Sequence, residues 1–315
     1  MVSLAPDAER AWRPDGPLDV ATTLAPLLRG QSDPSARLER DGAFWRATRT
    51  PEGAATLRIT RRGDDVHFAA WGPGAGHAVA HGPELCGALD SPADFAPPPA
   101  LRDLHRRNPG LRIPRTRAVY EALFRAVLEQ RVTSMEASRA YRALVGRFGE
   151  PAPGPCALRL VPSPETLRHV PYFELHPLGV EMRRAETLRF IASRAARLEE
   201  TATFELAEAR ARLQAIPGVG VWTIAEVSVV ALGDADALSV GDFHLKNLVA
   251  FALTGRPRGT DDDMVALLEP FRPHRARVMR LLALSRIRPP AFGPKRALHD
   301  FRNRLVPKAF GRARH

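Results

Sequence analysis

A cluster of four prolines divides this 315-residue chain into two stretches whose apolar residues repeat with different periods. Before the cluster, between residues 44 and 81, runs such as Phe-Trp-Arg-Ala-Thr and Ala-Thr-Leu-Arg-Ile-Thr are separated by turns that contain glycine, which predicts antiparallel strands. After it, apolar residues recur at spacings of three and four, which predicts helices. The expected boundary between the two regions lies at Pro92, Pro97, Pro98 and Pro99.

The predicted fold class is α+β. An antiparallel or mixed sheet with a flanking helix at residues 17–29 is expected to form a domain over residues 1–98, and an all-α domain to follow over residues 99–295. Residues 296–315 form a basic tail. The apolar stripes of the second domain predict helices at residues 120–128, 135–148, 183–198, 204–215, 221–232, 242–254 and 261–285.

The composition favours a polyanionic partner. Forty-six lysines and arginines stand against 35 acidic residues, a net charge of +11, which suits DNA, RNA or an acidic membrane. An arginine- and proline-rich chain also arises from genomic base composition, so charge alone does not choose. No signal peptide is recognisable, and no uncharged apolar run approaches the ~18 residues of a membrane span, so we expect a cytoplasmic protein without a membrane partner.

The most informative motif is Ile-Pro-Gly-Val-Gly-Val-Trp-Thr at residues 216–223, between two predicted helices. Gly218 and Gly220 permit positive φ and leave no side chain over the turn. The first amides of the second helix are then free donors at the positive end of a helix dipole, which suits a phosphate. An ordinary helical hairpin, whose turn often contains glycine, is the alternative.

The sequence downstream of the hairpin adds a resemblance to a known family. Residues 213–242, which include Trp222 and end at Ser-Val-Gly-Asp, resemble the helix-hairpin-helix and Gly/Pro-rich-loop-Asp signature of the DNA glycosylase superfamily. The tryptophan after the hairpin is most similar to the DNA-3-methyladenine glycosylase II family. Segments 108–130 and 178–188 agree, so the resemblance covers residues from about 105 to 290.

The resemblance implies a set of site residues. Asp242 maps to the catalytic carboxylate, although aspartate is also a favoured helix N-cap. Trp222 and Glu226 would line the base pocket, and Glu226 is the candidate if the reaction uses a general acid. Core packing for Trp222 and a solvated or DNA-rim position for Glu226 are the alternatives. Lys246 is expected to pair with Asp242 one turn away or to lie in solvent, the other interpretation being a rival amine nucleophile. The residues implied to contact DNA are Pro217, Gly218, Val219, Gly220, Gln130 and Arg131.

Arg131 and Trp222 differ from the residues that relatives carry at the matching positions. Arg131 stands where the family inserts an apolar wedge into the gap left by the flipped base; an arginine can stack there or contact a phosphate. Trp222 stands where bifunctional relatives carry the lysine that forms a Schiff base, so a monofunctional enzyme is implied.

The resemblance also bears on cofactors. The family binds a monovalent cation through hairpin carbonyls, which map to Gln214, Ile216 and Val219. Cys86 and Cys156 are too few for the iron–sulfur cluster of some relatives, and no other cofactor is expected.

The sequence therefore predicts a monomeric, nucleoid-associated DNA N-glycosylase that flips alkylated bases, of the 3-methyladenine and 7-methylpurine type, out of damaged duplex DNA and hydrolyses their glycosidic bond. Two alternatives stay open. One is a glycosylase for oxidised or deaminated bases, and the other is a noncatalytic protein that uses the hairpin only to bind DNA.

Overall fold

The computed structural model describes residues 5–30 and 32–290, so the predicted basic tail lies outside the described residues. All strands of the described chain belong to one antiparallel sheet with the order β1-β5-β4-β3-β2. The α+β class and the antiparallel pairing are as predicted, and the mixed alternative is not seen in this sheet. The strands are β1 Ala8–Trp12, β2 Ala36–Leu38, β3 Phe44–Thr50, β4 Gly53–Arg62 and β5 Asp65–Trp71.

The register of the sheet builds its core. Phe44, Ile59 and Phe68 are directly opposite one another on β3, β4 and β5, and all three are fully buried. Helices α1 (Val20–Leu24) and α2 (Ala75–Ala80) contribute apolar side chains to the same core. On the other face, Trp45 stacks on Trp71 with ring centroids 5.4 Å apart. Cys156, Leu158 and Leu160 belong to the same cluster, so both faces of the sheet are covered by other parts of the chain.

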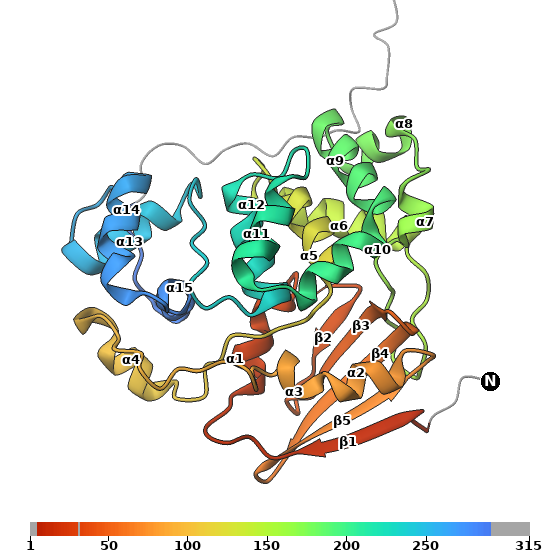
Figure 1. The fold of residues 1–315 in the computed structure, drawn as a ribbon, viewed down its shortest axis with the longest axis horizontal. Coiled ribbons are helices and arrows are strands. Elements are labelled where there is room, and N and C mark those ends of the chain that lie inside the picture. The colour runs from red at the N-terminus through yellow and green to blue at the C-terminus, as the bar shows by residue number, and fades with distance from the viewer. Residues whose placement is uncertain (1–4, 31, 291–315) are drawn as a thin grey trace, which may run out of the picture.

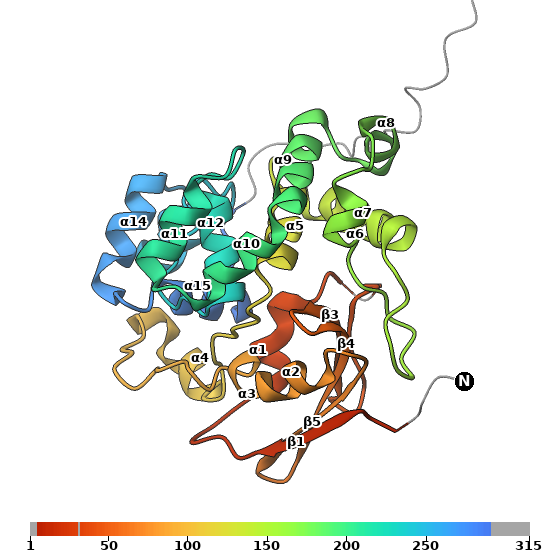
Figure 2. The same ribbon diagram turned by 45° about the vertical axis from the view of Figure 1, so that its right-hand side comes forward.

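The remaining helices are nearly all C-terminal to the sheet, as Figures 1 and 2 show. Helix α5 carries the centre of the largest core through Val119, Leu123, Phe124 and Val127. A separate core joins α13, α14 and α15 at one end of the molecule. The helices are α3 Gly82–Leu85, α4 Arg102–Arg107, α5 Val119–Glu129, α6 Ser134–Phe148, α7 Pro164–Leu167, α8 Tyr172–Leu175, α9 Met182–Ser193, α10 Ala195–Glu199, α11 Leu206–Gln214, α12 Val221–Val227, α13 Leu245–Thr254, α14 Asp261–Leu268 and α15 Arg275–Leu284.

Several predicted helix limits are wrong. The helix expected over residues 261–285 is two helices, because Pro270 and Pro273 lack the amide that a continuous helix needs. The helix expected over residues 17–29 is only α1 followed by a 3₁₀ turn at Ala25–Leu27. The helix expected from residue 242 begins at Leu245, because its N-cap is His244 and the side chain of Asp242, two residues earlier, accepts from the amide of Leu245.

Polar contacts fasten the sheet to the helices. Glu121 of α5 accepts hydrogen bonds from the side chains of Arg46 and Thr48 on β3 at 2.7 and 3.0 Å. Arg29, between the 3₁₀ turn and β2, pairs with Glu129 at the end of α5 at 2.5 Å. The second contact brings a residue of the sheet region to the helical hairpin described below. Within the described ranges, no helix is long and apolar enough to cross a membrane.

Candidate active site

The predicted hairpin is present as α11, a turn at residues 215–220 and α12. Its two glycines have different roles. Gly218 has a φ of +81°, and a Cβ there would collide with the side-chain oxygen of Thr187, so only glycine fits. Gly220 has a φ of −104°, and a Cβ there would meet no atom within 4 Å. Gly220 caps α12 without a side-chain hydrogen bond, so the amides of the first helical turn keep their donors.

Gln130, directly after α5, forms hydrogen bonds to this turn. Its side-chain nitrogen donates to the carbonyl of Gly218 and to Oγ1 of Thr223, both at 2.9 Å. The hydrogen bonds of Gln130 thus tie the loop between α5 and α6 to the hairpin. Arg131, the next residue, is exposed and has a φ of +56°, which is unfavourable for a residue with a Cβ. The backbone strain at this loop therefore falls on Arg131.

Asp242 accepts hydrogen bonds from two kinds of donor, backbone amides and an indole. Oδ1 accepts from the amides of His244 and Leu245 at 2.7 and 2.9 Å, so the carboxylate caps α13. Oδ2 accepts from the indole Nε1 of Trp222 at 3.1 Å, 20 residues earlier on α12. The N-cap position itself is His244, so Asp242 binds the start of α13 from two residues before the cap. This contact does not exclude a catalytic role, because the second oxygen faces the hairpin.

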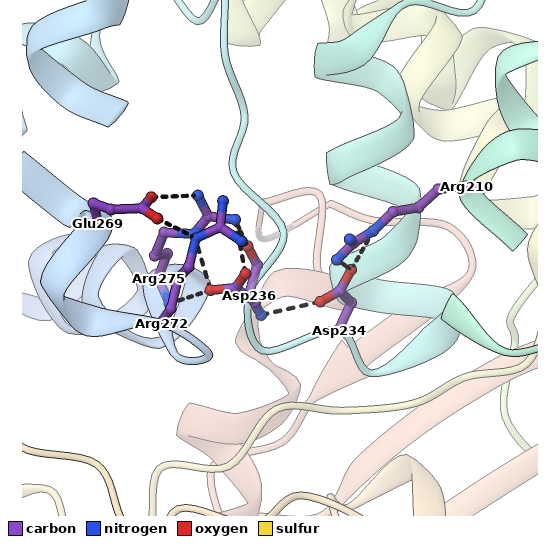
Figure 3. A network of polar contacts seen from close by, with 6 residues as sticks. All are labelled: Arg210, Asp234, Asp236, Glu269, Arg272 and Arg275. Atoms are coloured by element: carbon purple, nitrogen blue, oxygen red, sulfur yellow. Dashed lines mark hydrogen bonds and ion pairs between the residues drawn. The ribbon is translucent and has the colours of Figure 1, made fainter. Parts of the chain in front are cut away.

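Salt bridges anchor the first part of the loop that carries Asp242, as Figure 3 shows. Asp234 is fully buried and pairs with Arg210 of α11. Asp236 forms a two-pronged contact with Arg275 of α15 at 2.9 and 2.7 Å. Between them, the carbonyl of Ala235 accepts from an amide at the start of α15. The loop is thus fixed to the hairpin on one side and to α15 on the other.

A third aspartate anchors the other end of the loop. Asp261 accepts from the amide of Gly241 and from Nζ of Lys246, each at 3.0 Å. The hydrogen bond from Lys246 holds the pKa of Asp261 below its usual range. The expected pairing of Lys246 with Asp242 is therefore wrong, because Asp261 provides the partner. Gly241 has a φ of +90°, which allows the chain to turn immediately before Asp242.

Two glutamates complete a group of carboxyl groups around Asp242. Glu226, one turn after Trp222 on α12, accepts a hydrogen bond from Oγ of Ser239 at 2.6 Å. Burial raises the pKa of Glu226 to about 7, and the charges of Glu129 and Asp242 act in the same direction. Burial also raises the pKa of Glu129, against the effect of Arg29. The site therefore contains two glutamates whose burial favours the protonated form.

These residues divide into those that the sequence identifies and those that it does not. Trp222, Glu226, Gln130 and Asp242 come together around the hairpin, as their assignment to one site requires. Arg29, Glu129 and Ser239 were not predicted. Glu129 had a local signal, a charged residue that ends the apolar stripe of α5. Arg29 had none, since it meets Glu129 across 100 residues of sequence.

Apolar side chains are also exposed around the hairpin. Phe243, directly after Asp242, is 78% exposed, and Val221, the first residue of α12, is 59% exposed. Met135 in the first turn of α6 is similarly exposed. The combination of bare amides, exposed apolar groups and Arg131 suits a nucleic acid.

The three carbonyls proposed for a cation lie at the end of α11 and in the turn. Gln214 is the last residue of α11, where carbonyls have no helical partner, and the carbonyl of Ile216 accepts from the amide of Val219 at 3.1 Å. A carbonyl has two lone pairs, so this turn bond leaves Ile216 able to bind a cation. In the described part of the chain, no cluster of His, Cys, Asp and Glu side chains could hold a metal ion.

Comparisons with known proteins agree in sequence and in fold. The chain is 31% identical over 232 residues, 70% of its length, to the probable bifunctional transcriptional activator/DNA repair enzyme AlkA of Mycobacterium tuberculosis, of which it covers 46%. It is 31% identical over 126 residues, 39% of its length, to DNA-3-methyladenine glycosylase 2 of Escherichia coli, of which it covers 45%. The chain spans about half the length of the curated relatives it matches. No family model matches the chain.

Solved structures show the same fold. A 3-methyladenine DNA-glycosylase from Archaeoglobus fulgidus matches with a TM-score of 0.74 and 18% identity, over 87% of this chain and 97% of that one. The chain belongs to the helix-hairpin-helix DNA glycosylase superfamily. An 8-oxoguanine glycosylase/lyase from Clostridium acetobutylicum also matches, with a TM-score of 0.65 and 14% identity over 88% of this chain and 96% of that one. The superfamily fold thus includes both relatives with and relatives without a named lyase activity.

Proposed function

We propose that this superfamily member is a monofunctional DNA N-glycosylase that hydrolytically releases alkylated bases, of the 3-methyladenine and 7-methylpurine type, from duplex DNA. One observation carries the proposal. Asp242 stands at the end of a loop fixed at both ends, and Trp222 binds the oxygen that faces the hairpin. A carboxylate held in this way is preorganised to stabilise positive charge on a nearby sugar.

The chemistry follows from that position. Breaking the bond between C1′ and the base nitrogen develops oxocarbenium character on the sugar, which the carboxylate of Asp242 stabilises. Water then adds to C1′ and loses a proton to the carboxylate or to solvent. A base alkylated at N3 or N7 already carries positive charge, so it leaves without strong acid assistance. The indole of Trp222 offers a π face to that cation.

The hairpin and the α5–α6 loop would hold the DNA. The free amides after Gly220 suit a phosphate, and the brace from Gln130 fixes the turn that presents them. Arg131 is the candidate for filling the gap left by the flipped base, since it is exposed and strained next to that brace. Its planar guanidinium can stack between bases.

Three further parts of the proposal concern the protein's surroundings. A monovalent cation would bind the carbonyls of Gln214, Ile216 and Val219 and strengthen the hold of the hairpin on a phosphate. The enzyme would act as a monomer on damaged duplex DNA. That substrate would place it at the nucleoid in the cytoplasm.

A glycosylase assay tests the proposal directly. Duplexes that contain 3-methyladenine, 7-methylguanine, hypoxanthine or 8-oxoguanine are incubated with excess protein, and the free base is measured separately from strand breaks. We expect release of the two methylated bases and intact abasic strands. Binding of duplex without release of any base would instead favour a noncatalytic DNA-binding protein, and release of 8-oxoguanine alone would favour an enzyme for oxidised bases.

A further inference from the structure

Glu226 has a position that the mechanism above does not use. It lies four residues after Trp222 on α12, so the two side chains lie on the same face of the helix. Trp222 donates to Asp242, and Ser239, three residues before Asp242, donates to Oε1 of Glu226 at 2.6 Å. Both residues of the helix thus contact the loop that ends in the catalytic candidate. Glu226 is therefore part of the same site as Asp242.

The second oxygen of Glu226 is available to a ligand. Within the described residues Oε2 makes no hydrogen bond, and it is not one of the side-chain atoms that are sealed from solvent without a partner. Oε2 is therefore not sealed from solvent. When the carboxyl group is protonated, Oε1 accepts from Ser239, which leaves the proton on Oε2.

The groups around Glu226 favour its protonated form near neutral pH. Burial and the charges of Glu129, on α5, and of Asp242, on the loop, raise the pKa of Glu226 to about 7. The bond from Ser239 and the charge of Arg29, from the sheet region, oppose this rise. Arg29 is paired with Glu129 at 2.5 Å, which weakens its effect on Glu226. A carboxyl group in such surroundings suits general acid catalysis.

We propose that Glu226 is a second catalytic residue, which donates a proton from Oε2 to N3 or N7 of an uncharged purine while its glycosidic bond breaks. This inference rests on the proposed function and extends it to neutral bases such as hypoxanthine, which would otherwise leave as anions. The electron pair of the breaking bond goes to the base, and the donated proton neutralises it. Water adds to C1′, its proton passes to Asp242 and then to solvent, and solvent reprotonates Glu226.

Two lesions of different charge test the role of Glu226. Single-turnover release of hypoxanthine and of 7-methylguanine is measured for the parent, Glu226→Gln and Glu226→Asp. Glutamine preserves the acceptor for Ser239 but has no acidic proton. We expect Glu226→Gln to lose at least about tenfold more of its hypoxanthine rate than of its 7-methylguanine rate. Glu226→Asp, which keeps the acid, should recover part of the difference.

The pH profile and a matched variant complete the test. In the parent, hypoxanthine release should fall as the pH rises through about 7, the pKa of Glu226, and this fall should be absent in Glu226→Gln. Glu208→Gln removes an exposed carboxylate from α11 and controls for charge near the DNA. Thermal melting of each variant checks folding.

The outcomes separate this proposal from the function on which it rests. Equal losses on both lesions, or an unchanged hypoxanthine rate in Glu226→Gln, would overturn the acid role. A parent enzyme that releases 7-methylguanine but no hypoxanthine would overturn it while leaving the proposed function intact. Release of neither base would overturn the proposed function, and the role of Glu226 with it.

Discussion

The indole Nε1 of Trp222 donates a hydrogen bond to Oδ2 of Asp242 at 3.1 Å. Oδ1 of the same carboxylate accepts from the amides of His244 and Leu245 at the start of α13. The two oxygens therefore contact two different helices, α12 and α13. A carboxylate with both oxygens engaged has one preferred orientation, which an electrostatic role at the sugar requires. The hairpin and the catalytic candidate are therefore coupled through a single side chain.

Asp242→Asn tests the role of the carboxylate. Although asparagine caps helices about as well as aspartate, we expect this substitution to lower the free energy of unfolding. Asparagine can keep the cap on α13, but its NH₂ group then faces the indole N–H of Trp222, so two donors meet. We expect a loss of about 1 kcal/mol in the free energy of unfolding and a fall of about a hundredfold or more in base release. Single-turnover release of 7-methylguanine and urea unfolding measure the two effects.

The control for this variant is Trp222→Phe, which removes the competing donor and keeps the charge of Asp242. In the Trp222→Phe background, Asp242→Asn should therefore cost little further stability but should still lower base release. If Asp242→Asn releases base at a rate comparable to the parent, Asp242 is only a cap and the catalytic group lies elsewhere.

Substitutions of the two hairpin glycines should separate folding from DNA binding. Gly218→Ala introduces a Cβ at a φ of +81° and against Thr187, so it should lower the free energy of unfolding by about 2–4 kcal/mol. Gly220→Leu meets no such obstacle and should fold normally, but its side chain would stand over the amides of α12. We expect an affinity loss of about tenfold for every duplex sequence, because phosphates carry no sequence information.

Fluorescence anisotropy at several salt concentrations measures this binding. Log affinity should fall linearly with log salt, with a slope of about 0.9 per neutralised phosphate, and Gly220→Leu should bind more weakly at each concentration. Affinity that does not change with salt would argue against phosphate binding, and Gly220→Leu binding as tightly as the parent would argue against the hairpin as the contact.

Sequence patterns predict the parts of this fold that depend on local periodicity. The stripes through Tyr120 to Leu128 and the alternation through β3, β4 and β5 correspond to observed elements. Edge strands β1 and β2 were missed, because β1 is largely exposed and β2 has only three residues. Such strands have little apolar alternation, and their pairing is decided by the neighbouring strand.

The site divides in the same way. Asp242 and Trp222 stand at fixed distances from a recognisable hairpin, so a motif identifies them. Arg29 meets Glu129, and Lys246 meets Asp261, through contacts that only the folded chain creates. Local spacing favoured Asp242 as the partner of Lys246, and tertiary packing provided a different carboxylate.

The ion pair of Lys246 with Asp261 bears on whether the product strand is cleaved or stays intact. Its Nζ lies 3.0 Å from Asp261, and Trp222 occupies the lyase position, so no amine is expected to attack C1′. Borohydride should trap no covalent adduct between the protein and DNA, and the product strand should stay intact with an abasic site. Trp222→Lys places an amine beside Asp242 and is expected to form the adduct. Trapping of the parent, abolished by Lys246→Met, would identify Lys246 as a nucleophile.

Arg29→Met tests the ion pair between the sheet region and α5. It removes the nearer of two arginines that pair with Glu129 and leaves only Arg125 at 3.9 Å, so we expect a loss of about 2–3 kcal/mol in the free energy of unfolding at neutral pH. Without Arg29 the pKa of Glu129 rises further above its unfolded value, so the loss should grow as the pH rises and shrink towards pH 5.

Arg29→Met combined with Glu129→Gln removes the buried carboxylate together with its nearer cation and should recover most of this stability. Urea unfolding at several pH values measures the cycle. A loss that is independent of pH, or one that the second substitution does not reduce, would mean that the Arg29 side chain stabilises the protein through packing alone.

Arg131 and Arg117 are the non-glycine residues with positive φ in the described chain, and the contacts of their side chains differ. Arg117 forms an ion pair with Glu84, whereas Arg131 makes no ion pair within the described residues. Strain without a compensating contact is typical of functional loops. Glycine adopts this φ freely, so Arg131→Gly should change the free energy of unfolding by less than about 1 kcal/mol.

Loss of a gap-filling side chain should matter only where a base must be pulled from an intact stack. We expect Arg131→Gly to lower release of 7-methylguanine from a paired duplex by about tenfold. The loss should be much smaller when the lesion lies in an unpaired bulge, because a bulged base is already partly unstacked. Arg139→Ala removes the same charge from an exposed position on α6 and should affect both substrates slightly and equally. Equal losses on paired and bulged DNA for Arg131→Gly would instead assign Arg131 to a phosphate contact.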